Sequence, residues 1–151
     1  MLREIVCDKF KNNRIEFHNG LNVILGTNEG DNSIGKSSFL LIIDFVYGGN
    51  TYTNAEDIIK NVGEHNICFS FKFSDEIHYF SREVINHHEV WVCNEKYEKK
   101  ESMKKDEFCD WLDRQYKVKL PYLNFRNIIS RYMRVYGKDN TNEKLPLHSV
   151  H

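Results

Sequence analysis

The chain has 151 residues, of which 40% are hydrophobic and 28% charged, and this size and composition predict one domain with a buried core. Its 21 lysines and arginines nearly balance 22 aspartates and glutamates, which argues against chain-wide attraction to nucleic acid or to an anionic membrane. The longest apolar run, residues 39–43, is too short to cross a bilayer, the first residues lack the apolar region of a signal peptide, and the four cysteines are too scattered for a paired zinc site. We therefore expect a cytoplasmic protein with reduced thiols and no membrane partner.

Three strands are expected in the first 25 residues. Residues 2–10 and 14–17 alternate loosely between apolar and charged side chains, and the polar turn 11–13 separates them. After a second turn at 18–20, the run Leu21–Leu25 is almost continuously apolar. Such a run predicts a strand that is buried on both faces.

A loop and a buried helix follow this strand. Residues 26–35 are rich in glycine, asparagine and serine, which indicates a loop. From Lys36 to Tyr47 apolar residues occupy every side, so we expect a helix in the middle of the domain, ended by Gly48 and Gly49. A short helix is expected at 55–61.

The second half of the chain predicts an antiparallel meander followed by helices. Strand patterns cover 67–73, 77–85 and 89–93, with turns at 74–76 and 86–88. The charged run 95–105 is interpreted as a turn and the start of a helix. Apolar residues at helical spacing then predict two amphipathic helices, one through Phe108 and Tyr116 and one through Phe125 and Tyr136. Residues 1–138 are expected to form the domain, and 139–151 a polar tail.

Residues Gly30–Ser37 match the phosphate-binding pattern G-x-x-x-x-G-K-[ST] in full. The glycines let the backbone curl so that successive N–H groups point at phosphate oxygens. Lys36 is expected to place its ammonium on the β and γ phosphates, and Ser37 to offer its hydroxyl to Mg²⁺. The positive N-terminal end of a helix that starts at Lys36 adds to the same site.

The context of the motif decides between two interpretations. A buried apolar strand before it and a buried apolar helix after it favour a genuine site for a nucleoside triphosphate with Mg²⁺. The alternative is a glycine-rich turn from strand to helix that merely contains Gly-Lys-Ser. The loop is long, and Gly26-Thr27-Asn28 is an alternative start for the phosphate cradle, although the spacing from Gly35 favours Gly30 as its first glycine. The expected ligand-binding residues are Gly30, Asn32, Ser33, Ile34, Gly35, Lys36, Ser37 and Ser38.

The first 49 residues resemble the N-terminal lobe of the ABC-type ATPases of the SMC, RecF, RecN and SbcC group. The resemblance lies in the segments 10–11, 15–17, 20–26, 32–38 and 41–49. It implies an α/β fold, a P-loop NTPase N-lobe with a mixed sheet and an antiparallel meander around the P-loop helix. It also implies ATP and Mg²⁺ as ligands, with Lys11 near the nucleotide. A solvent-exposed turn lysine is the alternative for Lys11.

The resemblance further implies a Q-loop glutamine, a signature motif, an Asp-Glu pair after a strand and a switch histidine. Gln115 lies on an expected helix, and Asp75-Glu76 follows an alternating strand and indicates a hairpin turn. We therefore expect the N-terminal half of a split ATPase head, which binds ATP better than it hydrolyses it. The partners implied are the C-terminal lobe of the same protein, a second copy joined through ATP, and DNA.

Three smaller patterns leave alternatives open. Arg82 is interpreted as a cross-strand charge partner, with contact to phosphate or DNA as the alternative. Asn127, Arg131, Arg134 and Lys138 form a basic stripe, either a solvated helix face or a contact to DNA phosphates. His87-His88 indicates a surface turn rather than a metal site.

The function expected is Mg-ATP binding within an SMC/RecN-like ATPase that acts on DNA in repair, chromosome maintenance or defence, through ATP-driven dimerisation of heads. A second interpretation is a non-hydrolysing regulatory or scaffold module that binds a nucleotide. A third, a small-molecule kinase, fits poorly because a meander follows the P-loop helix.

Overall fold

A computed structural model describes residues 1–24, 32–118 and 122–132, and within these ranges it leaves out the side chains of 32–34, 36, 37, 56, 57 and 130–132. The strands are β1 (Leu2–Val6), β2 (Arg14–Glu16), β3 (Asn66–Phe73), β4 (Glu76–Glu83), β5 (Glu89–Cys93) and β6 (Lys99–Lys104). The helices are α1 (Asn32–Val46), α2 (Glu56–Val62), α3 (Lys105–Gln115) and α4 (Phe125–Tyr132). None of the helices in the described ranges is long and apolar enough to cross a membrane.

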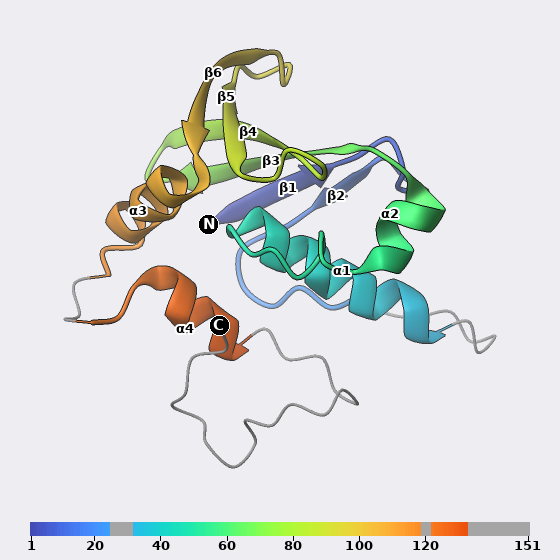
Figure 1. The fold of residues 1–151 in the computed structure, drawn as a ribbon. Helices are drawn as coiled ribbons and strands as arrows, with labels where there is room; N and C mark the ends of the chain where they lie inside the picture. Colours follow the sequence, from blue (N-terminus) through green and yellow to red (C-terminus); the bar gives the residue numbers. More distant parts are fainter. Residues whose placement is uncertain (25–31, 119–121, 133–151) are drawn as a thin grey trace.

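The strands form a six-stranded sheet in the order β2-β1-β3-β4-β5-β6, and each pair of neighbours is antiparallel. The expected α/β class and the meander from β3 to β5 are confirmed. In Figure 1, α1 lies along one face of the sheet, with α2 near one end of it and α3 and α4 toward the other. The expectation of a mixed sheet is wrong for the described residues, because no parallel pair occurs among these strands.

The strand expected at Leu21–Leu25 is absent from the described part of this segment. Residues 21–24 form no strand, and Leu21, Val23 and Ile24 are 81%, 64% and 47% exposed. An apolar run becomes a strand buried on both faces only when other strands flank it. Here β1 already pairs with β2 and β3, and no described strand pairs with 21–24.

The charged segment expected to begin a helix contains strand β6 instead. Lys99–Lys104 pairs with β5, and α3 begins only at Lys105. Lysine and glutamate have low strand propensity, so the sequence pattern gave no strand signal. At the edge of a sheet the same charged residues are favourable, because they discourage pairing with another chain.

Helix α1 begins at Asn32, four residues before the expected start at Lys36. The first N–H groups of a helix find no acceptor within it, and residues such as asparagine and serine are favoured there because their side chains can accept from these groups. Burial increases along the helix: Ser38 to Leu41 are half-buried, whereas Phe45 and Val46 are fully buried. The helix therefore joins the core through its C-terminal half.

The core lies between the sheet and the helices. Phe69, Phe71 and Phe80 project from β3 and β4, where alternation puts them on one face. Phe108 of α3 packs on this group, with ring centroids 5.1 Å from Phe80 and 5.9 Å from Phe69. Tyr47, just after α1, lies 5.3 Å from Phe71. These contacts hold α1 and α3 on the same face of the sheet.

Candidate functional site

The described part of the segment that matches the P-loop pattern lies at the N-terminal end of α1. Asn32 to Ser38 lie in its first two turns, whereas Gly30 lies outside the described residues. The structure gives the backbone but not the side chains of Asn32, Ser33, Ile34, Lys36 and Ser37. The N–H groups of a helix's first turn lack partners within the helix and carry a partial positive charge, so they favour an anion.

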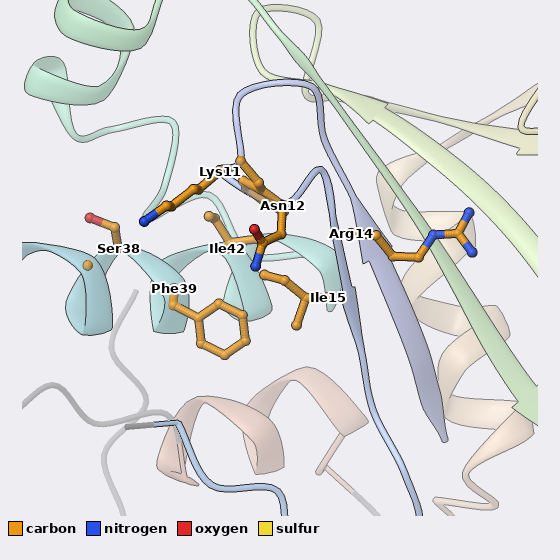
Figure 2. Close-up of a pocket in the computed structure, with 9 residues that line it drawn as sticks. Lys11, Asn12, Arg14, Ile15, Ser38, Phe39 and Ile42 are labelled. Carbon is orange, nitrogen blue, oxygen red and sulfur yellow. The ribbon is translucent and has the colours of Figure 1, made fainter. Parts of the chain in front are cut away.

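A pocket of about 340 Å³ lies beside this end of α1 (Figure 2). The turn between β1 and β2 forms one side, and the N-terminal part of α1, from Gly35 to Ile42, forms the other. Its walls are mainly apolar, and the residues that line it are Phe10, Lys11, Asn12, Arg14, Ile15, Gly35, Ser38, Phe39 and Ile42. This volume lies at the lower end of the range for small-ligand sites. The structure thus brings Lys11 close to Gly35 and Ser38, which lie much later in the sequence.

The two basic residues of the pocket point in different directions. In Figure 2 the Lys11 side chain extends toward Ser38 on α1, whereas Arg14 points away from the pocket. The Arg14 guanidinium lies 3.1 Å from the Glu4 carboxylate, whose side chain is only 6% exposed. No carboxylate in the described ranges forms an ion pair with Lys11. Lys11 is therefore the cation that this pocket offers to an anionic ligand.

Gly35 leaves space open at the pocket wall. A Cβ placed on Gly35 would meet no atom within 4 Å, and the residue is exposed. Packing within the described part of the protein therefore does not demand glycine here. A glycine at this position lets a ligand approach the backbone closely.

The opposite end of α1 is held by Arg82, which is fully buried on β4. Its guanidinium donates to the carbonyl oxygens of Phe45 and Gly49 at 2.7 and 2.8 Å, and to Asn50 Oδ1 at 3.0 Å. Its Nε donates to the carbonyl of His87 at 2.8 Å. The guanidinium also stacks over the Phe45 ring, 4.0 Å from its centroid. A cation at the C-terminal end of a helix is stabilised by the helix dipole.

Neither of the roles expected for Arg82 is correct. Its partner across the ladder is the apolar Ile67, and its hydrogen bonds go to helix and turn acceptors rather than to a carboxylate. Burial lowers the pKa of Arg82 to about 10, which still leaves it charged at neutral pH. A signal for this existed in the sequence, because Phe80, Arg82 and Val84 share one face of an alternating strand.

An ion pair with a buried carboxylate lies close to the same end of α1. Arg126 of α4 contacts Asp44 of α1 at 2.5 Å, and the two side chains are 26% and 8% exposed. Asp44 Oδ2 and Arg126 Nη1 are buried without a hydrogen-bond partner in the described structure. Gly49 packs directly on this carboxylate, since a Cβ there would lie 1.9 Å from Asp44 Oδ2.

Replacing Gly49 with alanine is expected to destabilise the protein by about 3 kcal/mol, because the methyl group would displace the Asp44 carboxylate from Arg126. Thermal and urea unfolding measure the loss. Gly35→Ala is the control: Gly35 lies in α1 without a positive φ and with nothing within 4 Å of an added Cβ, so no loss of stability is expected. Equal losses in the two variants would contradict the close contact at Asp44.

The remaining sequence candidates lie away from the pocket. Gln115 ends α3, as expected from its helical context, and Asp75-Glu76 lies at the β3–β4 hairpin. His87 and His88 occupy the expected turn, with ring centroids 4.2 Å apart. In the basic stripe, Arg134 and Lys138 lie outside the described residues, as does the tail 139–151, so the stripe stays a prediction.

Comparisons with known proteins add no relative. A scan against protein-family models, a search of curated proteins and a search of solved structures each found no match.

Proposed function

We propose that the chain binds Mg-ATP as the N-terminal half of an SMC/RecN-like ATPase head. The observation that carries the proposal is that the described part of the Gly30–Ser37 motif, from Asn32 onward, forms the N-terminal end of α1 beside a pocket. A helix end favours phosphate, the motif supplies Lys36 and Ser37, and the pocket offers Lys11.

The residues present suit the parts of the ligand. Apolar walls that include Phe10, Ile15 and Phe39 favour a flat base, while Lys11 at the turn favours a phosphate. The open space beside Gly35 fits close approach of a ligand to the backbone. Lys36 would neutralise phosphate charge, and Ser37 would be a ligand of Mg²⁺, which draws electron density from the terminal phosphate.

The exposed segment 21–24 supports a second lobe. Leu21, Val23 and Ile24 are apolar and solvent-exposed, which is unfavourable unless another surface covers them. We propose that the C-terminal lobe of the same protein packs here and supplies the groups that orient water for hydrolysis. ATP would then join two heads, and the whole protein would act on DNA.

Calorimetric titration with Mg-ATP tests the proposal. We expect saturable binding that is lost when EDTA removes Mg²⁺, that is stronger for ATP than for GTP, and that occurs without phosphate release. Release of phosphate by the isolated chain would contradict its dependence on a second lobe. Absence of saturation at millimolar Mg-ATP, in a sample that circular dichroism shows to be folded, would reject nucleotide binding by this chain.

A further inference from the structure

We propose that Arg82 is a positioning residue: it anchors the C-terminal end of α1 to the sheet and thereby sets where the motif-bearing N-terminal end lies. This inference rests on the proposed function for its ligand, but the anchoring itself is a property of the fold.

The contacts of Arg82 join three separate parts of the structure. The residue belongs to β4, which is flanked by β3 and β5 within the sheet. Three of its hydrogen bonds reach Phe45, Gly49 and Asn50, at the end of α1 and in the segment directly after it. The fourth reaches the carbonyl of His87 in the turn between β4 and β5. A single fully buried guanidinium therefore ties α1 to the sheet.

The helix is less buried toward its opposite end, where the structure describes its side chains. Burial is complete at Phe45 and Val46 but only partial from Ser38 to Leu41, where the pocket begins. The 15-residue helix is about 22 Å long. A tilt of roughly 5° at the anchored end therefore moves the other end by about 2 Å. Because a misplacement of about 1 Å in a binding or catalytic site can reduce activity by a factor of about 100, the anchor controls the site from a distance.

Lysine cannot replace Arg82 in this role. Arginine presents five donors in a rigid planar fork, whereas the lysine ammonium is a compact charge with three donors. Arg82→Lys keeps the charge but cannot reach all the acceptors of Arg82 at once. Asn50→Ala is a milder variant that removes one acceptor and leaves the other three. Leu112→Ala, in the buried face of α3, is the control for a general loss of stability.

Two measurements test the proposal, each made where circular dichroism shows every variant to be folded. In hydrogen exchange, we expect the α1 amides to exchange at least tenfold faster in Arg82→Lys than in wild type, and to accelerate less in Asn50→Ala. In Leu112→Ala, we expect the α1 amides to accelerate no more than the β3 and β4 amides of the same variant. In calorimetry, we expect Arg82→Lys to weaken Mg-ATP binding about tenfold and Leu112→Ala to change it less than twofold.

The outcomes separate the anchor from the proposed function. The anchor would be overturned if the α1 amides exchanged at the wild-type rate in Arg82→Lys, or if they accelerated equally in Arg82→Lys and Leu112→Ala. Either result counts whether or not nucleotide binds. Mg-ATP binding by wild type with equal affinity in Arg82→Lys would overturn the positioning role and leave the proposed function standing. A wild type that does not bind Mg-ATP rejects the proposed function, and the exchange comparison still decides the anchor.

Discussion

Lys36→Ala is expected to weaken Mg-ATP binding by a factor on the order of 100, about 2.7 kcal/mol of binding free energy. Lys36 is the only residue of 30–38 with a positive charge, since the others are glycine, asparagine, serine, Asp31 and Ile34. Loss of one partner from a charged hydrogen-bonded contact to phosphate costs about 2–5 kcal/mol. Calorimetry on folded wild type and variant measures the change.

Three further variants are compared with Lys36→Ala. Lys60→Ala removes an equal charge from an exposed position on α2, outside the pocket, and we expect it to leave affinity unchanged. Lys11→Ala is expected to weaken Mg-ATP binding about tenfold, the loss typical of one solvent-accessible charged contact. Gly35→Ala is expected to fold normally, because no atom lies within 4 Å of its Cβ, and yet to bind more weakly. Unchanged affinity in Lys36→Ala would place any nucleotide site elsewhere.

Arg126→Met is expected to lower the free energy of unfolding by about 3 kcal/mol, because it leaves the Asp44 carboxylate buried without its cation. Asp44→Asn is expected to be costly for the complementary reason. The double variant removes both charges, so we expect it to lose less than the sum of the single losses, with a coupling energy of about 1–3 kcal/mol. Urea unfolding of the four proteins measures this cycle.

The more exposed pair Lys99–Glu83 is the control for the pair with the buried carboxylate. Its side chains are 35% and 37% exposed, and a surface ion pair contributes at most about 1 kcal/mol. Glu83→Gln should therefore cost much less than Arg126→Met. Additive losses in the Asp44 and Arg126 cycle would show that the two side chains do not interact in solution.

Those parts of the fold were predictable in which a few neighbouring residues decide the structure. Alternation located β3 and β5 nearly to the residue, and apolar residues at helical spacing located α3. Strand β6 was missed because its charged residues carry no strand signal, and its pairing depends on the neighbouring β5. The start of α1 was placed too late because helix first turns and loops share the same polar residues.

The candidate site divides in the same way. The motif at the N-terminal end of α1 is visible in sequence, since its chemistry depends on consecutive residues. The pocket beside it joins that helix to Lys11 and the β1–β2 turn, a neighbourhood that only folding creates. The role of Arg82 was hidden for a related reason: strand alternation places it inside, but three of its acceptors lie at the end of α1 and directly after it, far away in the chain.

The sequence by itself determined the match to the P-loop pattern, the meander and the apolar helix that follows the glycine-rich segment, because each depends on residues within a few positions of one another. Tertiary structure decided which apolar runs are covered and which buried charges meet. It leaves Leu21, Val23 and Ile24 exposed despite their strand-like pattern, and it brings Asp44 against Arg126. Burial and ion pairing depend on what packs from distant parts of the chain, and no local pattern specifies that.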